Sequence, residues 1–142
     1  MTVHLVKLSA GTQSVDDLKD RIKRSIRARN ASQKSARHVH VTRMRPKREA
    51  EILDGGSIYW VIKGFILARQ TVVGLERRTG SDQVERTAIV MDPKIILTEP
   101  TPRRAFQGWR YLPVDDAPAD LASGKGSIPP TLHRALAELG LL

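Results

Sequence analysis

The chain contains no cysteine, and this single absence removes several kinds of chemistry. Disulfide bonds, thiol nucleophiles and zinc–thiolate sites all require cysteine, so the sequence excludes them. A chain without cysteine is also compatible with a reducing compartment, and we expect the protein to be cytoplasmic.

Long apolar runs are missing as well. No segment approaches the roughly 20 apolar residues that a transmembrane helix needs, and the N-terminal residues MTVHLVKLSAG lack the pattern of a secretory signal. We therefore expect no membrane partner.

With 142 residues, of which 40% are hydrophobic and 27% charged, the chain has the size and composition of one soluble globular domain. We predict that this domain spans residues 1–142.

Acidic residues are in short supply relative to basic ones. The chain has 15 Asp and Glu against 24 Lys and Arg, which gives a net charge of +9, and its isoelectric point is near 10.5. Such an excess attracts polyanions, and nucleic acid is the commonest polyanion in a cell. The alternative is that the positive charge serves only solubility.

The spacing of apolar residues predicts an α+β fold. Residues 3–8 (VHLVKL) alternate between apolar and polar positions, as in a strand with one buried face. Ser14 is a suitable N-cap for a helix that extends to Asn30 and carries apolar residues three and four positions apart. Further strands are expected at residues 37–42, 58–62, 65–73, 75–78, 84–91, 95–97 and 106–112, and a last helix at residues 131–142. We predict that the strands form a mixed, partly closed β-barrel flanked by these two helices.

Four basic residues gather between the strand at 37–42 and a short helix expected at KREAEILD, in which Ala50 and Leu53 would turn inward. They are Arg43, Arg45, Lys47 and Arg48. Cations at a helix N-terminus oppose the helix dipole, so helix stability does not explain them. The exposed N–H groups there attract anions, which predicts a phosphate or carboxylate ligand; the alternative is a solvated turn. Residues that extend the same surface are Lys63, Arg103 and Arg104.

Aromatic residues make up only 4% of the chain, and both tryptophans and both tyrosines fall in two segments. Tyr59 and Trp60 are adjacent on a predicted strand, so they should face opposite sides of it. In the later segment Trp109 and Tyr111 share a face, with Arg110 between them. We expect the two segments to meet and to leave a ring exposed beside arginine, where a base of single-stranded nucleic acid can stack for roughly 1–3 kcal/mol. The alternative is that all four rings belong to the core.

Signals for catalysis or metal binding are weak. His38 and His40 lie two positions apart on a predicted strand, and His4 or an aspartate would be needed as a third metal ligand. No H-E-x-x-H or G-x-S-x-G motif occurs, and G-K-G at residues 124–126 is too short for a phosphate-binding P-loop. We therefore predict no catalytic residue, no metal and no cofactor.

Three motifs, HVTRMRPKR, GSIYWVIKG and FQGWRYL, resemble in order and spacing an uncharacterised family of short bacterial proteins known as domain of unknown function 1489. The resemblance covers nearly the whole chain. It implies a bacterial, cytoplasmic protein and supplies no established activity.

A looser resemblance, over about a third of the chain, is to the PUA-like superfamily of PUA, ASCH and EVE domains. The segment from Lys47 to Glu76 is similar to their pattern of a short helix, a glycine turn and a kinked strand pair. The resemblance implies a small β-barrel that binds RNA or modified bases, and it favours RNA over DNA. It places in the cleft Arg43, Lys47, Arg48, Tyr59, Trp60 and Lys63, with Trp109 and Arg110 opposite.

The leading hypothesis is an RNA- or nucleotide-binding module whose basic turn holds phosphate and whose aromatic rings hold a base. A second hypothesis is a small enzyme acting on a phosphorylated or carboxylated metabolite. In that enzyme Arg43 or Lys47 would bind the anion, and His38 or His40 would be the general base. A third is a protein–protein adaptor whose C-terminal segment LHRALAELGLL docks on another protein or pairs with itself.

Overall fold

The computed structural model describes residues 1–30, 37–104 and 106–121. The elements, in chain order, are β1 (Val3–Leu8), α1 (Val15–Asn30), β2 (His38–Thr42), α2 (Glu49–Ile52), β3 (Ser57–Ile62), β4 (Phe65–Thr79), β5 (Glu85–Met91), β6 (Ile96–Pro102), β7 (Trp109–Pro113) and the 3₁₀ helix η1 (Val114–Asp116). The α+β class is therefore confirmed, and the helix expected at residues 131–142 lies outside the described residues.

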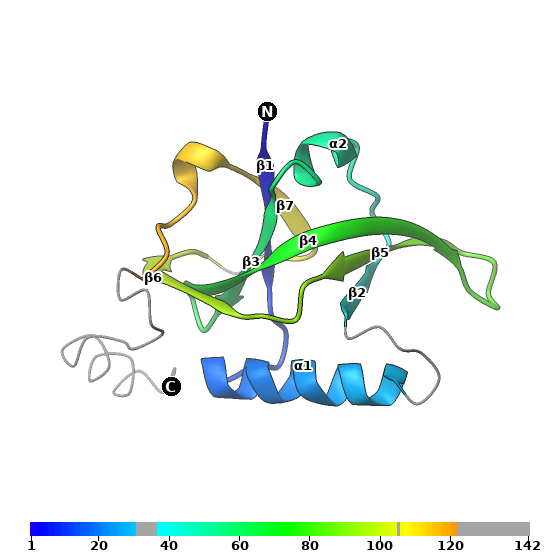
Figure 1. Ribbon diagram of the computed structural model, residues 1–142, viewed down its shortest axis with the longest axis horizontal. Helices are drawn as coiled ribbons and strands as arrows, with labels where there is room; N and C mark the ends of the chain where they lie inside the picture. The colour runs from blue at the N-terminus through cyan, green and yellow to red at the C-terminus, as the bar shows by residue number, and fades with distance from the viewer. Residues whose placement is uncertain (31–36, 105, 122–142) are drawn as a thin grey trace.

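The strands form one mixed seven-stranded sheet (Figure 1). Six of the strands follow the order β2-β5-β4-β3-β1-β7. The seventh, β6, pairs with β4 and is not part of this linear order. Among the described residues the two end strands, β2 and β7, do not pair with each other, so the sheet is open and the expected barrel does not close. The physical reason lies in the chain that follows β2: the Trp109 indole nitrogen in β7 donates a hydrogen bond of 3.0 Å to the Met44 carbonyl oxygen. A turn, rather than a strand, therefore lies beside β7.

Strand β1 links the two aromatic segments. It pairs in parallel with β3 and antiparallel with β7. In this register Lys7 lies opposite Trp60 on one side and opposite Trp109 on the other. Since directly paired residues point to the same face of a sheet, Lys7 lies in one row with the two tryptophans.

Strand β4 is long and bends in the middle. Its first half pairs with β3 and β6, and its second half pairs with β5 across a bulge between Val72 and Gly74. A bulge adds a residue to one strand and bends it without ending it. The two strands predicted at residues 65–73 and 75–78 are therefore one strand that kinks near Gly74.

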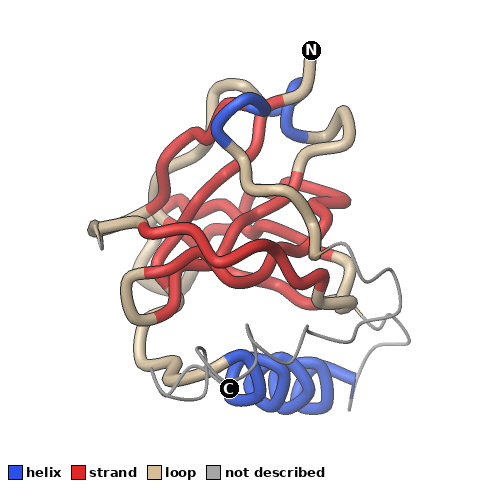
Figure 2. The backbone as a smooth tube through the Cα atoms, turned by 90° about the vertical axis from the view of Figure 1, so that its left-hand side faces the viewer, coloured by secondary structure: helices blue, strands red, loops and turns tan. Residues whose placement is uncertain are grey.

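Helix α1 covers one face of the sheet (Figures 1 and 2). The Ser14 hydroxyl oxygen caps it by accepting a hydrogen bond of 3.1 Å from the backbone nitrogen of Asp17. Val15, Leu18 and Ile22 are 3–4% exposed and belong to the larger core cluster, which confirms the predicted apolar face. A second cluster fills the opposite face of the sheet and contains Val6, Tyr59, Val61, Ile66 and Leu112.

Helix α2 is a single turn, shorter than predicted. Ile52 is its buried residue, whereas Ala50 is exposed and Leu53 is 41% exposed, so the prediction that these two turn inward is wrong. Close packing behind the turn fixes this orientation. A Cβ atom on Gly56 would lie 2.4 Å from the Ile52 carbonyl oxygen and 2.5 Å from that of Val3. Only glycine can bring these backbones together.

Candidate functional site

The basic turn, which comprises Arg43, Arg45, Lys47 and Arg48, lies against β7. The Tyr111 hydroxyl oxygen accepts hydrogen bonds from the backbone nitrogens of Lys47 at 2.8 Å and Arg48 at 3.1 Å. The sequence predicts that backbone N–H groups at this position bind an anionic ligand. Because Tyr111 already occupies them and α2 is only one turn long, the backbone of the turn offers no free anion site there.

Half of the charge of the basic turn is also neutralised. Arg45 pairs with Glu49 at 3.0 Å, and Arg48 pairs with Glu51 at 2.5 Å. The second pair is a charge-assisted hydrogen bond that raises the pKa of Arg48 and lowers the pKa of Glu51. Within the described part of the chain, the cations of this turn without an acidic partner are Arg43 and Lys47.

Three of the aromatic residues that were predicted to bind the ligand are buried. Tyr59 and Trp60 are each 4% exposed, and Trp109 is 6% exposed. Adjacent residues of β3 are buried together because this strand has a core cluster on each of its faces. The Trp60 indole nitrogen is satisfied inside, where it donates a hydrogen bond of 2.9 Å to the Gln70 side-chain oxygen. These rings present no open face for a base in the folded chain, and they fit the alternative in which they are core residues.

Two other predicted site residues, Arg103 and Arg110, contact Phe106, a residue that the sequence analysis did not select. The guanidinium carbons of Arg103 and Arg110 lie 5.5 Å and 5.2 Å from the centre of the Phe106 ring. The backbone nitrogen of Arg103 donates a hydrogen bond of 2.8 Å to the Gly64 carbonyl oxygen, which joins this segment to the turn between β3 and β4. We call these residues, together with Lys63 next to Gly64 and Arg104 next to Arg103 in the chain, the Phe106 cluster; it comprises Lys63, Arg103, Arg104, Phe106 and Arg110.

The Phe106 cluster differs from the basic turn in charge balance and in position. No acidic side chain among the described residues forms an ion pair with any of its four cations. Side chains alternate along β7, so Arg110 projects from the face opposite to that of Trp109 and Tyr111, which contact the basic turn. Arg110 and the basic turn therefore lie on opposite faces of the sheet, so the residues predicted as one surface fall into two separate groups.

A signal for Phe106 is present in the sequence. The ring lies between the pair Arg103-Arg104 and Arg110, an interleaving of aromatic and basic residues that is typical of nucleic-acid-binding surfaces. The prediction of a strand over residues 106–112 included Phe106, whereas β7 begins at Trp109.

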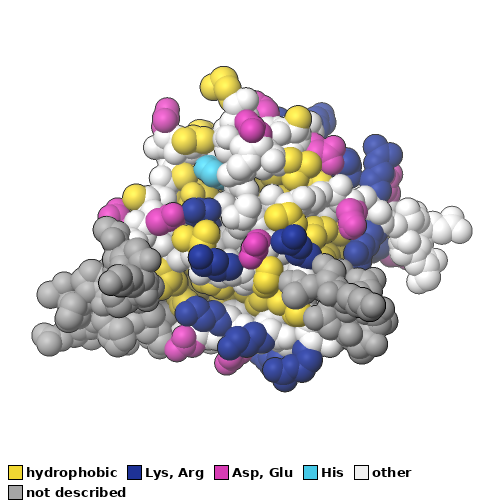
Figure 3. Space-filling model, viewed as in Figure 1, with side chains coloured by type: hydrophobic (Ala, Val, Ile, Leu, Met, Phe, Trp, Pro, Cys, Tyr) yellow, Lys and Arg dark blue, Asp and Glu magenta, His cyan; other side chains and the backbone are white. Residues whose placement is uncertain are grey.

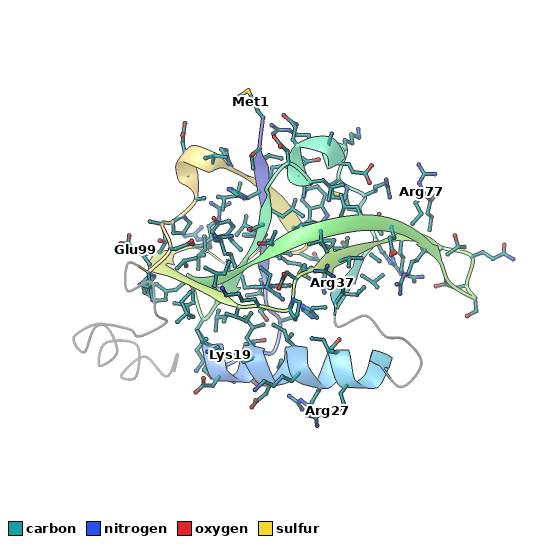
Figure 4. All side chains as sticks on the ribbon, viewed as in Figure 1. Met1, Lys19, Arg27, Arg37, Arg77 and Glu99 are labelled. Atoms are coloured by element: carbon teal, nitrogen blue, oxygen red, sulfur yellow. The ribbon has the colours of Figure 1, made fainter. Side chains whose placement is uncertain are left out.

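Positive charge is also spread over α1 and the strands above it, with acidic side chains among it (Figure 3). Arg27, for example, projects from the side of α1 that faces away from the sheet (Figure 4). Near the distal end of the β4–β5 hairpin, Arg77 is paired with Glu85 at 3.6 Å. This broad distribution attracts polyanions without forming a defined site.

The two histidines of β2, an end strand of the sheet, contact side chains of β4 and β3. The His38 Nδ1 atom is 3.2 Å from the Gln70 side-chain oxygen, and the His40 ring packs edge-on against Trp60 with 5.8 Å between ring centres. Burial, followed by the nearby charges of Lys7 and His38, lowers the pKa of His40 to about 4. Within residues 1–30, 37–104 and 106–121, no three His, Asp or Glu side chains are grouped so that they would hold a metal ion.

No described helix combines the length and apolar character needed to cross a membrane. No curated protein and no solved structure matches the chain, so the resemblance to PUA-like domains stays a hypothesis. A family described as "Protein of unknown function (DUF1489)" matches residues 5–142, nearly the whole chain. This match confirms the resemblance carried by the three motifs, and the chain belongs to the DUF1489 family.

Proposed function

We propose that this protein binds single-stranded RNA, or the phosphate-bearing part of a nucleotide, through the Phe106 cluster. The observation that carries the proposal is the local charge balance. Arg103, just after β6, and Arg110 of β7 meet at one ring without an acidic partner among the described residues. Lys63, beside Gly64, and Arg104, beside Arg103, are the neighbouring cations in the chain and also lack such a partner. Bringing like charges together is unfavourable unless an anion offsets their repulsion, and a phosphate backbone is such an anion.

Contact with Phe106 holds the arginines in place without neutralising them. A cation–π contact at an exposed site contributes about 0.5–1 kcal/mol and leaves the N–H donors of the guanidinium group free. Those donors match the geometry of a phosphate, to which arginine binds with two parallel hydrogen bonds. Arg103 and Arg110 are therefore suited to bind phosphate beside this ring.

The ring of Phe106 favours a single-stranded ligand. It is partly exposed, unlike Tyr59, Trp60 and Trp109, and it lies beside two arginines. Unpaired bases stack on such rings, whereas the bases of a duplex are already stacked on one another. The preference for RNA over DNA rests on the PUA-like resemblance, and a duplex and a DNA strand serve as comparison ligands.

Fluorescence anisotropy of a labelled single-stranded RNA tests this proposal. The double variant Arg103→Gln/Arg110→Gln should weaken binding about tenfold or more, because two phosphate contacts are lost. Phe106→Leu should weaken binding at every salt concentration, since stacking does not depend on charge.

Two matched controls remove the same charge elsewhere. Arg43→Gln/Lys47→Gln removes the unpaired cations of the basic turn, and Arg24→Gln/Arg27→Gln removes two cations of α1. Both should reduce affinity less than about threefold at physiological salt, where distant charges are screened. If the basic-turn variant shows the largest loss, phosphate binds at that turn and the Phe106 cluster is not the site. If all three variants lose affinity equally, the +9 charge acts only as a diffuse field.

A further inference from the structure

A small polar pocket lies where the end of β1 meets α1 and β2, with a volume of about 220 Å³. Its polar lining comprises Lys7, Ser9, Thr12, Arg21, His38 and His40, and Trp60 forms part of its wall. No aspartate or glutamate is among the described residues that line it. The pocket therefore has a positive potential and donors of several kinds.

Lys7 is the cation in this pocket that has no acidic partner among the described residues. It is partly buried in the row between Trp60 and Trp109, and burial lowers the pKa of its ammonium group. No hydrogen bond or ion pair joins that ammonium to any described residue. A partly buried, unpaired cation costs free energy, so packing alone does not explain a lysine at this position.

The other charged group of the pocket is already engaged. The Arg21 guanidinium donates a hydrogen bond of 2.7 Å to the Gly11 carbonyl oxygen and lies 3.5 Å from the Asp17 carboxylate. Arg21 therefore holds the loop after β1 in place. His40, whose pKa is about 4, is neutral near pH 7 and can donate or accept a hydrogen bond without adding charge.

Hydroxyl groups complete the lining. The hydroxyl oxygens of Ser9 and Thr12 are 2.5 Å apart, so one donates to the other and at least one O–H remains free to turn toward a ligand. A pocket of 220 Å³ is smaller than the roughly 300–1,000 Å³ that encloses a drug-sized molecule. It fits the charged end of a small molecule.

We infer that this pocket is a second binding site, which takes the phosphate or carboxylate group of a small metabolite with the Lys7 ammonium as its charge partner. The inference does not depend on RNA binding, since the Phe106 cluster shares no residue with the pocket. The sequence-based hypothesis of a metabolite-binding enzyme assigned the anion to Arg43 or Lys47. The present inference assigns it to Lys7 instead.

The test is an NMR titration of the full chain with inorganic phosphate and, separately, with acetate, at constant ionic strength. The imidazole resonances of His38 and His40 should shift and saturate with at least one of the two anions. His4 should not follow, because its Nδ1 atom accepts a hydrogen bond of 3.0 Å from the Ser57 backbone nitrogen away from the pocket. Saturation with phosphate alone identifies a phosphorylated ligand, and saturation with acetate alone identifies a carboxylate.

Lys7→Met keeps the length of the side chain and removes its charge, so it should weaken anion binding at least tenfold. Lys19→Met is the matched control on exposed α1 surface and should leave binding unchanged. Lys7→Met should retain its fold and its RNA affinity, which separates this inference from the proposed function. His40→Gln provides a second variant, for which the anion should shift His38 less than in the wild type.

The inference is overturned if neither anion produces a saturable shift, or if Lys7→Met binds as tightly as the wild type. It is also overturned if Lys19→Met weakens binding as much as Lys7→Met, because the effect would then follow net charge.

Discussion

The hydroxyl oxygen of Tyr111 lies 2.8 Å from the backbone nitrogen of Lys47 and accepts its hydrogen bond across 64 residues of the chain. This contact attaches the basic turn to β7. It also removes from the turn the free N–H group on which anion binding at a helix end depends.

Replacing Tyr111 with phenylalanine should lower the free energy of unfolding by about 1 kcal/mol, since the hydroxyl satisfies two backbone donors that lie near the surface. Equilibrium unfolding in urea measures the change. Tyr59→Phe is the matched control, because no described residue forms a hydrogen bond with the Tyr59 hydroxyl. A Tyr111→Phe variant as stable as the wild type would mean that water replaces these hydrogen bonds without cost.

Gly56→Ala should be among the most damaging single-methyl additions in the described part of the chain. The new Cβ atom would lie 2.4 Å and 2.5 Å from two backbone oxygens, which have no side-chain freedom to move aside. We expect a loss of about 2–3 kcal/mol or more, measured by chemical denaturation followed through tryptophan fluorescence.

Gly74→Ala is the control for that experiment. Its nearest neighbour would be the Val90 Cβ atom at 3.7 Å, an ordinary contact, and the substitution should change stability by less than about 0.5 kcal/mol. Equal losses at Gly56 and Gly74 would show that the close approach behind α2 does not exist in solution.

Stability should fall as the pH decreases from about pH 7 to pH 5. The pKa of His40 is about 4 in the folded chain against 6.5 for an ordinary histidine, so over this range the unfolded chain binds a proton that the folded chain does not. Protonation therefore favours unfolding, by about 2 kcal/mol at most. His4, whose pKa is lowered by burial and by Arg69, contributes in the same direction.

Urea denaturation at several pH values measures this slope. His40→Gln should remove most of it and leave the part that belongs to His4. A slope that His40→Gln does not change would contradict the burial of a neutral His40 ring against Trp60.

Local patterns were sufficient for much of the fold. The alternation in VHLVKL predicts β1 with its observed bounds, and Ser14 caps α1 as its sequence indicates. Local patterns did not predict the burial of β3, where all six residues are buried. Adjacent residues on a strand point to opposite sides, so a sequence with two neighbouring aromatic residues suggests that one ring is exposed. That inference fails when both faces of the strand are covered by other parts of the chain.

The candidate site depended on contacts that no local pattern contains. The Phe106 cluster forms because β6 pairs with β4, which brings Arg103 beside Gly64, and because β7 places Arg110 near the same ring. The sequence identifies the basic residues but not which of them have acidic partners. Arg48 illustrates this, since it appears as a free cation in the sequence and is paired with Glu51 in the structure.

The central claim is that single-stranded RNA lies on the Phe106 cluster, and photo-cross-linking to RNA that contains a photoreactive uridine tests it most directly. Mass spectrometry of the digested complex identifies the cross-linked residues. We predict that Phe106 and its neighbours in residues 106–110 carry the cross-link, and that excess unlabelled single-stranded RNA competes it away. Cross-links confined to residues 43–48 or to α1, or cross-links that unlabelled RNA does not reduce, would contradict the claim.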